Sequence, residues 1–207
     1  ALQKRHANID WQAVQDVVIG CAMPEAEQGM NIARIASLLS GVPDTVPAMT
    51  INRFCSSGVQ SIATAAASLP NGSSPALALA GGLESMSRVP LGGNKYTMNP
   101  AIFENEHVAI AYGMGITAEK VAEQWGISRE AQDKFAVESH TRALAAVARG
   151  DFSAEIVPVP VTRRVLDLKT GQVVIDKFEV SQDEGPRSDT SYEKIARLRP
   201  VFSSKGT

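Results

Sequence analysis

Residues 46–65 have the sequence VPAMTINRFCSSGVQSIATA. The first part of this stretch is apolar and suits a strand, whereas the last part consists mainly of small residues that suit a buried helix. Cys55 lies between the two parts and is followed by Ser56, Ser57 and Gly58. The pattern predicts a strand, a tight turn and a helix, with Cys55 at or near the helix N-terminus.

The predicted position of Cys55 suits a nucleophile. Unpaired backbone N–H groups and the helix dipole favour negative charge at a helix N-terminus, so a thiolate is stabilised there. The same N–H groups can stabilise an oxyanion that develops on a substrate carbonyl. A small buried cysteine without a catalytic role is equally compatible with the composition. The small residues after Cys55 favour the nucleophile, because they leave room for a substrate.

The segment Asn52-Arg53-Phe54-Cys55-Ser56-Ser57-Gly58 resembles the nucleophile motif of the thiolases. Three further stretches resemble the same family in the same order, namely AGGLESMS at residues 80–87, GMGITAE at 113–119 and LRPVF at 198–202. The resemblance covers essentially the whole chain. It implies an α/β protein with a thiolase-like fold, in which helices cover a mostly parallel five-stranded sheet. The chain would be the N-terminal half, with the first strand missing and an inserted helix-rich loop domain.

The composition changes near Arg88, where a stretch rich in Gly, Asn and Pro begins. Together with the resemblance, this change predicts two domains. Residues 1–87 would form the core that carries the nucleophile, and residues 88–207 a mostly helical loop domain with a small β-hairpin that binds coenzyme A. The C-terminal thiolase domain is not expected within these 207 residues, so we expect a fragment of a longer thiolase.

Apolar periodicity and turn residues predict the remaining elements. They indicate strands at 17–22 and 76–82, helices at 31–40, 117–125, 129–149 and 190–197, and hairpin strands at 156–161 and 172–176. Thr117 and Ser128 are the expected N-caps of the two longer helices in the second half. The alternation of strands and helices in the first half predicts a parallel sheet with helices on both faces.

The composition excludes several classes of function. A net charge of -2 gives no electrostatic reason to expect binding to nucleic acid or a membrane surface, and no apolar run approaches the roughly 18 residues of a membrane span. The two cysteines, Cys21 and Cys55, suit a reducing compartment, so we expect a cytoplasmic location. The histidines His6, His107 and His140 lack metal-ligand spacing, and no metal site is predicted.

The resemblance implies acyl transfer between a 3-ketoacyl-CoA and coenzyme A, which is a substrate rather than a cofactor. Cys55 would attack the 3-keto carbon, acetyl-CoA would leave, and the acyl-cysteine would pass its acyl group to a second CoA thiol. The reverse reaction is a Claisen condensation. The family supplies the base, the second acid/base and an oxyanion asparagine from its second half. None of those motifs occurs here, so we expect this chain alone to be inactive.

Two residues match substrate-binding positions of the family. Met114 matches a position that lines the acyl or pantetheine pocket, although core packing is nearly as typical of a methionine. Arg187 matches an arginine near the CoA nucleotide, and a solvated loop charge is the alternative. Biosynthetic thiolases often carry His-Met-Gly where this chain has Gly113, Met114 and Gly115. The sequence therefore favours the degradative type, which serves fatty acid β-oxidation.

Two other interpretations remain open at the level of sequence. The chain could act only as a binding or assembly module, because it lacks the acid/base motifs. A decarboxylating ketosynthase of the same superfamily is the other alternative, and the segment at 113–119 and the long loop domain argue against it. The resemblance also implies a homodimer or homotetramer, with the apolar stretch 46–53 at a sheet edge suited to pairing.

Overall fold

The structure is a computed structural model that describes residues 1–69, 76–104 and 108–207. His107 therefore lies outside the described residues. The chain divides into two compact units, Ala1–Met98 and Asn99–Thr207. The division falls after Met98 rather than after residue 87, where the composition changes. The assignment of the second part as a domain that binds coenzyme A stays a prediction.

Three parallel strands form the sheet of the first unit. They are β1 (Val14–Gly20), β2 (Ala48–Ile51) and β3 (Leu77–Gly82), in the order β2-β1-β3. The predicted parallel α/β arrangement is confirmed. The expected number of strands is not reached, because the described residues contribute only three to this sheet. The remaining strands, β4 and β5, instead pair with each other in the second unit.

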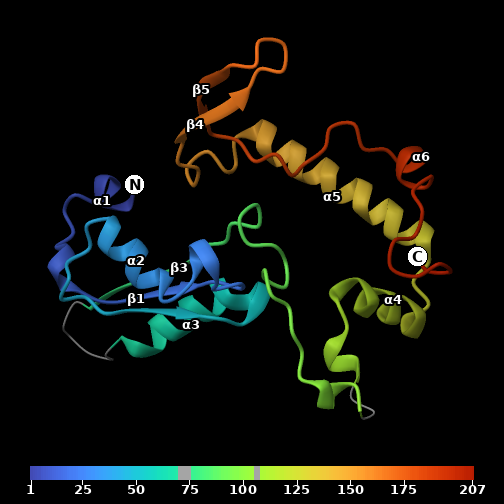
Figure 1. Ribbon diagram of the computed structural model, residues 1–207, viewed down its shortest axis with the longest axis horizontal. Coiled ribbons are helices and arrows are strands. Elements are labelled where there is room, and N and C mark those ends of the chain that lie inside the picture. Colours follow the sequence, from blue (N-terminus) through green and yellow to red (C-terminus); the bar gives the residue numbers. More distant parts are fainter. Residues whose placement is uncertain (70–75, 105–107) are drawn as a thin grey trace. The chain divides into compact units, whose positions relative to one another are not determined.

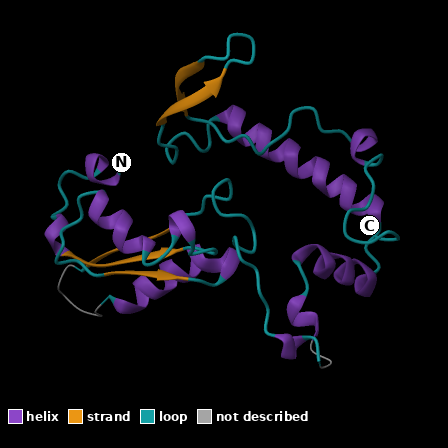
Figure 2. Cartoon of the chain, in the orientation of Figure 1, coloured by secondary structure: helices purple, strands orange, loops and turns teal. Residues whose placement is uncertain are grey.

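Helices α2 (Ile32–Leu39) and α3 (Ser57–Ser68) connect the three strands and cover the sheet. The connection from β1 to β2 and the connection from β2 to β3 cross the sheet in opposite directions. Because crossovers between parallel strands are right-handed, the two helices lie on opposite faces (Figures 1 and 2). Helix α2 packs on β1 and β2, and α3 packs mainly on β1 and β3.

The central strand β1 carries the core of the first unit. Val14 and Val17 form a buried cluster with Val42 and Val46, and Val18 is fully buried. A register shift between Val14 and Asp16 interrupts the ladder with β3. Strand β1 begins at Val14 rather than at residue 17, because the polar residues Gln15 and Asp16, which precede the apolar run, also belong to the strand.

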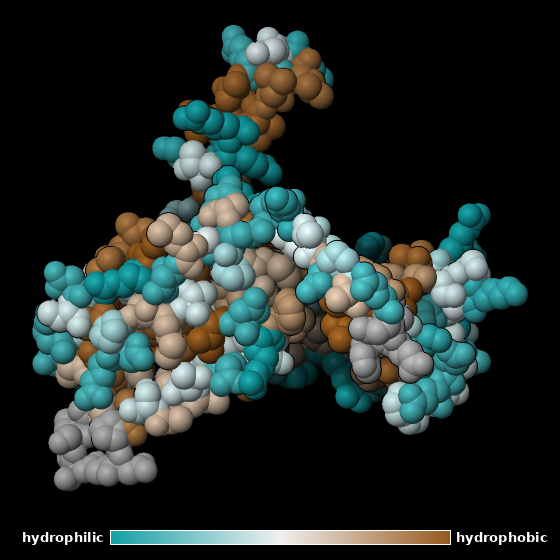
Figure 3. Space-filling model, turned by 60° about the horizontal axis from the view of Figure 1, so that its bottom comes forward, coloured by the Kyte–Doolittle hydropathy of each residue, from teal (hydrophilic) through white to brown (hydrophobic). Residues whose placement is uncertain are grey.

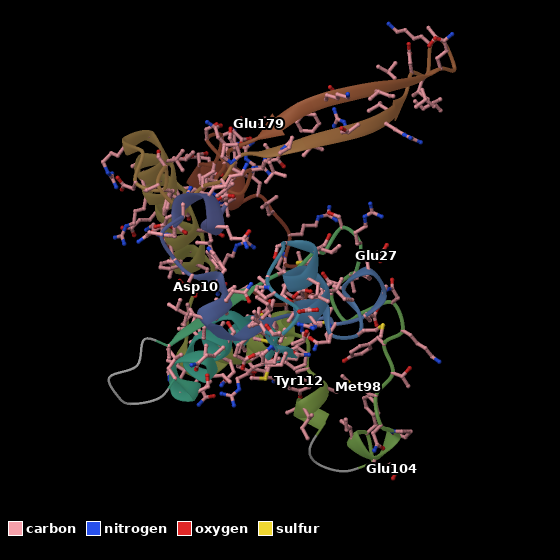
Figure 4. The ribbon with its side chains drawn as sticks, turned by 90° about the vertical axis from the view of Figure 1, so that its left-hand side faces the viewer. Asp10, Glu27, Met98, Glu104, Tyr112 and Glu179 are labelled. Atoms are coloured by element: carbon pink, nitrogen blue, oxygen red, sulfur yellow. The ribbon has the colours of Figure 1, made fainter. Side chains whose placement is uncertain are left out.

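The lead-in to the sheet is a set of short turns. Helix α1 (Leu2–Arg5) is followed by a 3-10 turn at Trp11–Ala13. The Asp10 carboxylate caps this turn by accepting the Gln12 N–H at 2.9 Å (Figure 4). Further 3-10 turns lie at Ala26–Gln28, Phe54–Ser56, Pro100–Ile102 and Val108–Ala111.

The second unit contains α4 (Met114–Trp125), α5 (Arg129–Arg149), the antiparallel strands β4 (Val159–Leu166) and β5 (Val173–Val180), and α6 (Tyr192–Ile195). The predicted cap of α5 is confirmed, because the Ser128 hydroxyl accepts the Ala131 N–H at 3.2 Å. The predicted cap of α4 is wrong. Thr117 lies inside that helix, where its hydroxyl donates to the Gly113 carbonyl at 3.3 Å.

Arg129 joins the elements of the second unit. Its Nε donates to the buried carboxylate of Asp133 at 2.8 Å, and its Nη2 donates to the carbonyls of Ile195 and Leu198 at 2.9 Å each. One guanidinium thus neutralises a buried charge and holds α6 against α5.

Among the described helices, none is both long and apolar enough to cross a membrane. The residues that the structure describes also contain no cluster of His, Cys, Asp and Glu that could bind a metal ion.

We predict that Arg129→Ala destabilises the second unit by about 3 kcal/mol, because the substitution leaves Asp133 buried without its partner. Urea unfolding followed by circular dichroism measures the loss. Arg142→Ala is the matched control on the same helix. Its ion pair with Glu138 is exposed to solvent, so no measurable loss is expected. Equal losses in the two variants would contradict the prediction.

Candidate active site

The candidate site lies at the carboxyl ends of the parallel strands. Strands β1 and β3 end in Gly20 and Gly82, and the chain that leaves β2 turns there into α3. This edge is where open parallel sheets bind ligands, at the point where the connections diverge. A cavity of about 400 Å³ is present, and its lining includes Gly20, Ala22, Met23, Phe54, Cys55, Gly58, Gly82 and Glu84.

Cys55 occupies the position that the sequence predicts. Strand β2 ends at Ile51, Cys55 sits in the 3-10 turn Phe54–Ser56, and α3 begins at Ser57. The thiol is exposed and lines the cavity. Ser56, the N-cap residue, makes no side-chain hydrogen bond to the helix. The arrangement thus presents a free thiol beside a helix N-terminus that has no side-chain cap.

The turn before Cys55 has an unusual backbone. Phe54 has a φ of +47°, a left-handed conformation that costs a residue with a side chain roughly 1–3 kcal/mol. Two side chains hold it in place. Asn52 Oδ1 accepts the Phe54 N–H at 2.8 Å, and the Ser57 hydroxyl donates to the Phe54 carbonyl at 2.6 Å. Ser57 also accepts the Arg53 N–H at 2.9 Å, so the turn is held on both sides.

Helix α3 is fixed to the sheet at its first turns. A Cβ built on Gly20 would lie 2.5–2.7 Å from atoms of Ser57, so only glycine fits at the end of β1. The fully buried hydroxyl of Ser61 lies 2.7 Å from the carbonyl oxygens of both Gly58 and Gly81, and its proton is shared between them. These contacts set the position of Cys55 relative to the strand ends.

Glu84 forms part of the site that sequence reasoning missed. Its carboxylate accepts the N–H groups of Ala22 at 2.7 Å and Met23 at 3.3 Å, which lie on the cavity wall. The buried Gln28 side chain donates to Glu84 and to the Met23 carbonyl, and accepts the Ser85 N–H at 2.8 Å. Glu84 lies within the AGGLESMS segment, which resembles the thiolases. The sequence does not indicate which residues Glu84 contacts, because these residues are distant from it along the chain.

Cys21 is a packed cysteine. It is 1% exposed, and its Sγ lies 3.8 Å from Oε1 of Glu84. Burial, and then the negative charge of Glu84, raise the pKa of the Cys21 thiol above its usual range. The two cysteines of the chain are therefore distinct, with Cys21 buried and neutral at physiological pH and Cys55 exposed.

Met114 and Arg187, the predicted substrate-binding residues, belong to the second unit. Met114 begins α4 and is 71% exposed, so it is not packed in the core of that unit. The exposed guanidinium of Arg187 pairs with Asp189 at 3.2 Å, which raises the pKa of Arg187 and lowers that of Asp189. The Arg187 N–H donates to His140 Nδ1 at 3.1 Å. The substrate-binding roles of Met114 and Arg187 stay predictions.

The cavity offers few groups for proton transfer. Among its described lining residues, Cys55 and Glu84 are the only ionisable ones, and none is a histidine. The Glu84 carboxylate is already engaged by the N–H groups of Ala22 and Met23. The described lining of the cavity therefore holds an exposed thiol and no other ionisable side chain that is free of hydrogen bonds.

Comparison with known proteins identifies the family. The sequence matches the family described as "Thiolase, N-terminal domain" over residues 1–207, and the chain belongs to this family. It is 50% identical over 197 residues to the 3-ketoacyl-CoA thiolase of Bacillus subtilis (strain 168), covering 94% of this chain and 49% of the relative. It is 41% identical over 205 residues to the "Probable acetyl-CoA acyltransferase" of Staphylococcus aureus (strain COL), with the same coverage.

A solved structure shows the same fold. The crystal structure of the Bacillus anthracis acetyl-CoA acetyltransferase matches with a TM-score of 0.77 and 34% sequence identity, over 99% of this chain and 52% of that one. The chain thus spans about half the length of the curated relatives it matches. The predicted resemblance to thiolases and the thiolase-like fold are confirmed.

We predict that iodoacetamide modifies Cys55 rapidly in the folded chain at pH 8 and leaves Cys21 unmodified, because only Cys55 is exposed. Peptide mass spectrometry after a short exposure identifies the modified residue. In Cys55→Ala, labelling should appear only after unfolding in urea. Modification of Cys21 at the same rate as Cys55 in the folded chain would contradict the burial described above.

Proposed function

We propose that this chain supplies the nucleophile of a thiolase, which transfers acyl groups between a 3-ketoacyl-CoA and coenzyme A. The observation that carries the proposal is the exposed Cys55 thiol in a strained turn at the start of α3, on a cavity of about 400 Å³. Membership in the thiolase N-terminal domain family and the names of the relatives support the same chemistry.

In the proposed reaction the Cys55 thiolate attacks the 3-keto carbon of the substrate. The bond between the second and third carbons breaks, its electron pair goes to the acetyl-CoA carbon, and that carbon takes a proton from an acid. An acyl-cysteine thioester remains, which the thiol of a second coenzyme A cleaves, returning the proton and freeing Cys55. A thioester suits this role because it stays reactive to another thiol.

The exposed N-terminus of α3 would stabilise negative charge in this reaction. The groups that move protons would come from outside the described cavity, since its only other ionisable lining residue, Glu84, is held by backbone N–H groups. In the thiolase resemblance these groups belong to the second half of the enzyme. The absence of a histidine from the described lining also supports the alternative that this chain by itself is only a binding or assembly module.

Finer assignments are part of the same proposal. The degradative, β-oxidation type is supported by Gly113, which stands where biosynthetic thiolases often carry a histidine. Met114 and Arg187 would contact the acyl or pantetheine part and the nucleotide of coenzyme A. A homodimer or homotetramer is supported by β2, which lies at an edge of the described sheet and has a free side for pairing. We also propose a cytoplasmic location.

The acyl-enzyme is the test of the proposed function. Acetoacetyl-CoA is mixed with the full-length thiolase that carries this chain, the reaction is quenched in acid, and peptides are mapped by mass spectrometry. An acetyl group is expected on Cys55, and Cys55→Ser should abolish its transfer to coenzyme A. An acetyl group on Cys21 with Cys55 free would refute the assignment of the nucleophile.

The 207-residue chain alone should not turn over acetoacetyl-CoA at a useful rate. Loss of members of a catalytic set that acts as a unit costs several orders of magnitude in rate. Thiolysis is measured by the loss of acetoacetyl-CoA absorbance, with Cys55→Ala as the control. Turnover that depends on Cys55 and approaches about 10 per second, the rate of an ordinary enzyme, would mean that the complete catalytic set lies within these residues.

A further inference from the structure

We infer that Glu84 is a positioning residue, which holds the turn that carries Cys55 through the backbone of Ala22 and the side chain of Asn52. This inference deepens the proposed function and rests on the nucleophilic role of Cys55. It is carried by a continuous chain of hydrogen bonds that joins the ends of all three strands of the sheet. Glu84 follows β3, Ala22 follows β1 and Asn52 follows β2.

The first link is between Glu84 and the wall of the cavity. Oε2 accepts the Ala22 N–H at 2.7 Å, and Oε1 accepts the Met23 N–H at 3.3 Å. Gln28 Nε2 donates to Oε1 as well and bonds the Met23 carbonyl at 2.9 Å. Hydrogen bonds to a carboxylate are stronger than neutral ones. The two oxygens therefore fix both the position and the orientation of the Ala22 peptide.

The second link runs from Ala22 to the turn. The Ala22 carbonyl accepts Nδ2 of Asn52 at 3.0 Å, and Oδ1 of Asn52 accepts the Phe54 N–H at 2.8 Å. Phe54 has the left-handed backbone described above and directly precedes Cys55. If Ala22 shifts, Asn52 loses its acceptor, and its Oδ1 no longer holds the strained turn in place.

The fold itself does not depend on this chain of hydrogen bonds. The core of the unit is the valine cluster around β1, and α3 is tied to β3 by the buried hydroxyl of Ser61. Glu84 is exposed to solvent, so the loss of its charge leaves no buried ion without a partner. Replacement of Glu84 should therefore alter the geometry at Cys55 more than the stability of the unit.

A through-space role of the Glu84 charge predicts the opposite result. The carboxylate lines the same cavity as Cys55, and a negative charge there disfavours the thiolate. Its removal would make Cys55 more reactive if charge alone mattered. Positioning predicts a less reactive Cys55, because the thiol loses its alignment with the N-terminus of α3. The sign of the change in reactivity separates the two roles.

The test measures the rate of Cys55 alkylation by iodoacetamide against pH, in the Cys21→Ala background of the 207-residue chain. Glu84→Gln should slow the reaction at neutral pH by about 10-fold, the scale of a helix N-terminal charge effect, and move the midpoint of the profile to higher pH. Glu27→Gln is the matched control. It removes the exposed carboxylate of Glu27 (Figure 4), which is next to Gln28 in the sequence and pairs with Arg88 at 3.6 Å. The alkylation rate and its pH profile should stay unchanged.

Asn52→Ala tests the same chain of hydrogen bonds from its other end and should give the same shift. Because both residues act along one path, the double variant should be no slower than the slower single variant. Faster or unchanged alkylation in Glu84→Gln, or additive effects in the double variant, would overturn the inference. Alkylation needs no acyl-CoA, so its outcome is independent of whether the acyl-enzyme experiment succeeds.

Discussion

The close approach of β1 to the start of α3 is the constraint on which the site depends. The two elements meet at Gly20 and Ser57, where no Cβ fits on the strand. At this contact the Ser57 hydroxyl accepts the Arg53 N–H and donates to the Phe54 carbonyl of the preceding turn. A larger residue at Gly20 would push the helix away, and the strained turn would lose its support. The position of the Cys55 thiol thus depends on Gly20 of β1 having no side chain.

The parts of the fold that depend on local sequence could be predicted. The strand, turn and helix around Cys55 follow from apolar and small residues, and the cap of α5 follows from Ser128. The start of α4 was misplaced because Thr117 is a good N-cap by type, while the helix begins at Met114 without a side-chain cap. Local preference located the helix but not its first turn.

The contacts that complete the site could not be predicted from local patterns. Glu84, Ala22 and Asn52 are far apart in the sequence, and they meet only because the strands are parallel and end at one edge.

The exposure of the apolar residues of α3 could not be predicted from the sequence either. Val59 is 73% exposed and Ile62 is 60% exposed, although helical periodicity gives no reason for them to face solvent. Apolar surface is visible elsewhere on the chain as well (Figure 3). Sequence patterns indicate which residues are apolar, but not which of them remain uncovered in this chain.

Part of the wall of the cavity beside Cys55 consists of residues with no side chain or only a methyl group, namely Gly20, Ala22, Gly58 and Gly82. This part of the wall has almost no rotamers, so a molecule that lies against it freezes little side-chain motion on binding. The same property removes adaptability. Residues without long side chains cannot change rotamer to admit a bulkier ligand. Under the proposed function, selection among acyl groups of different size would come from the longer side chains that also line the cavity, such as Met23, Met86 and Leu91.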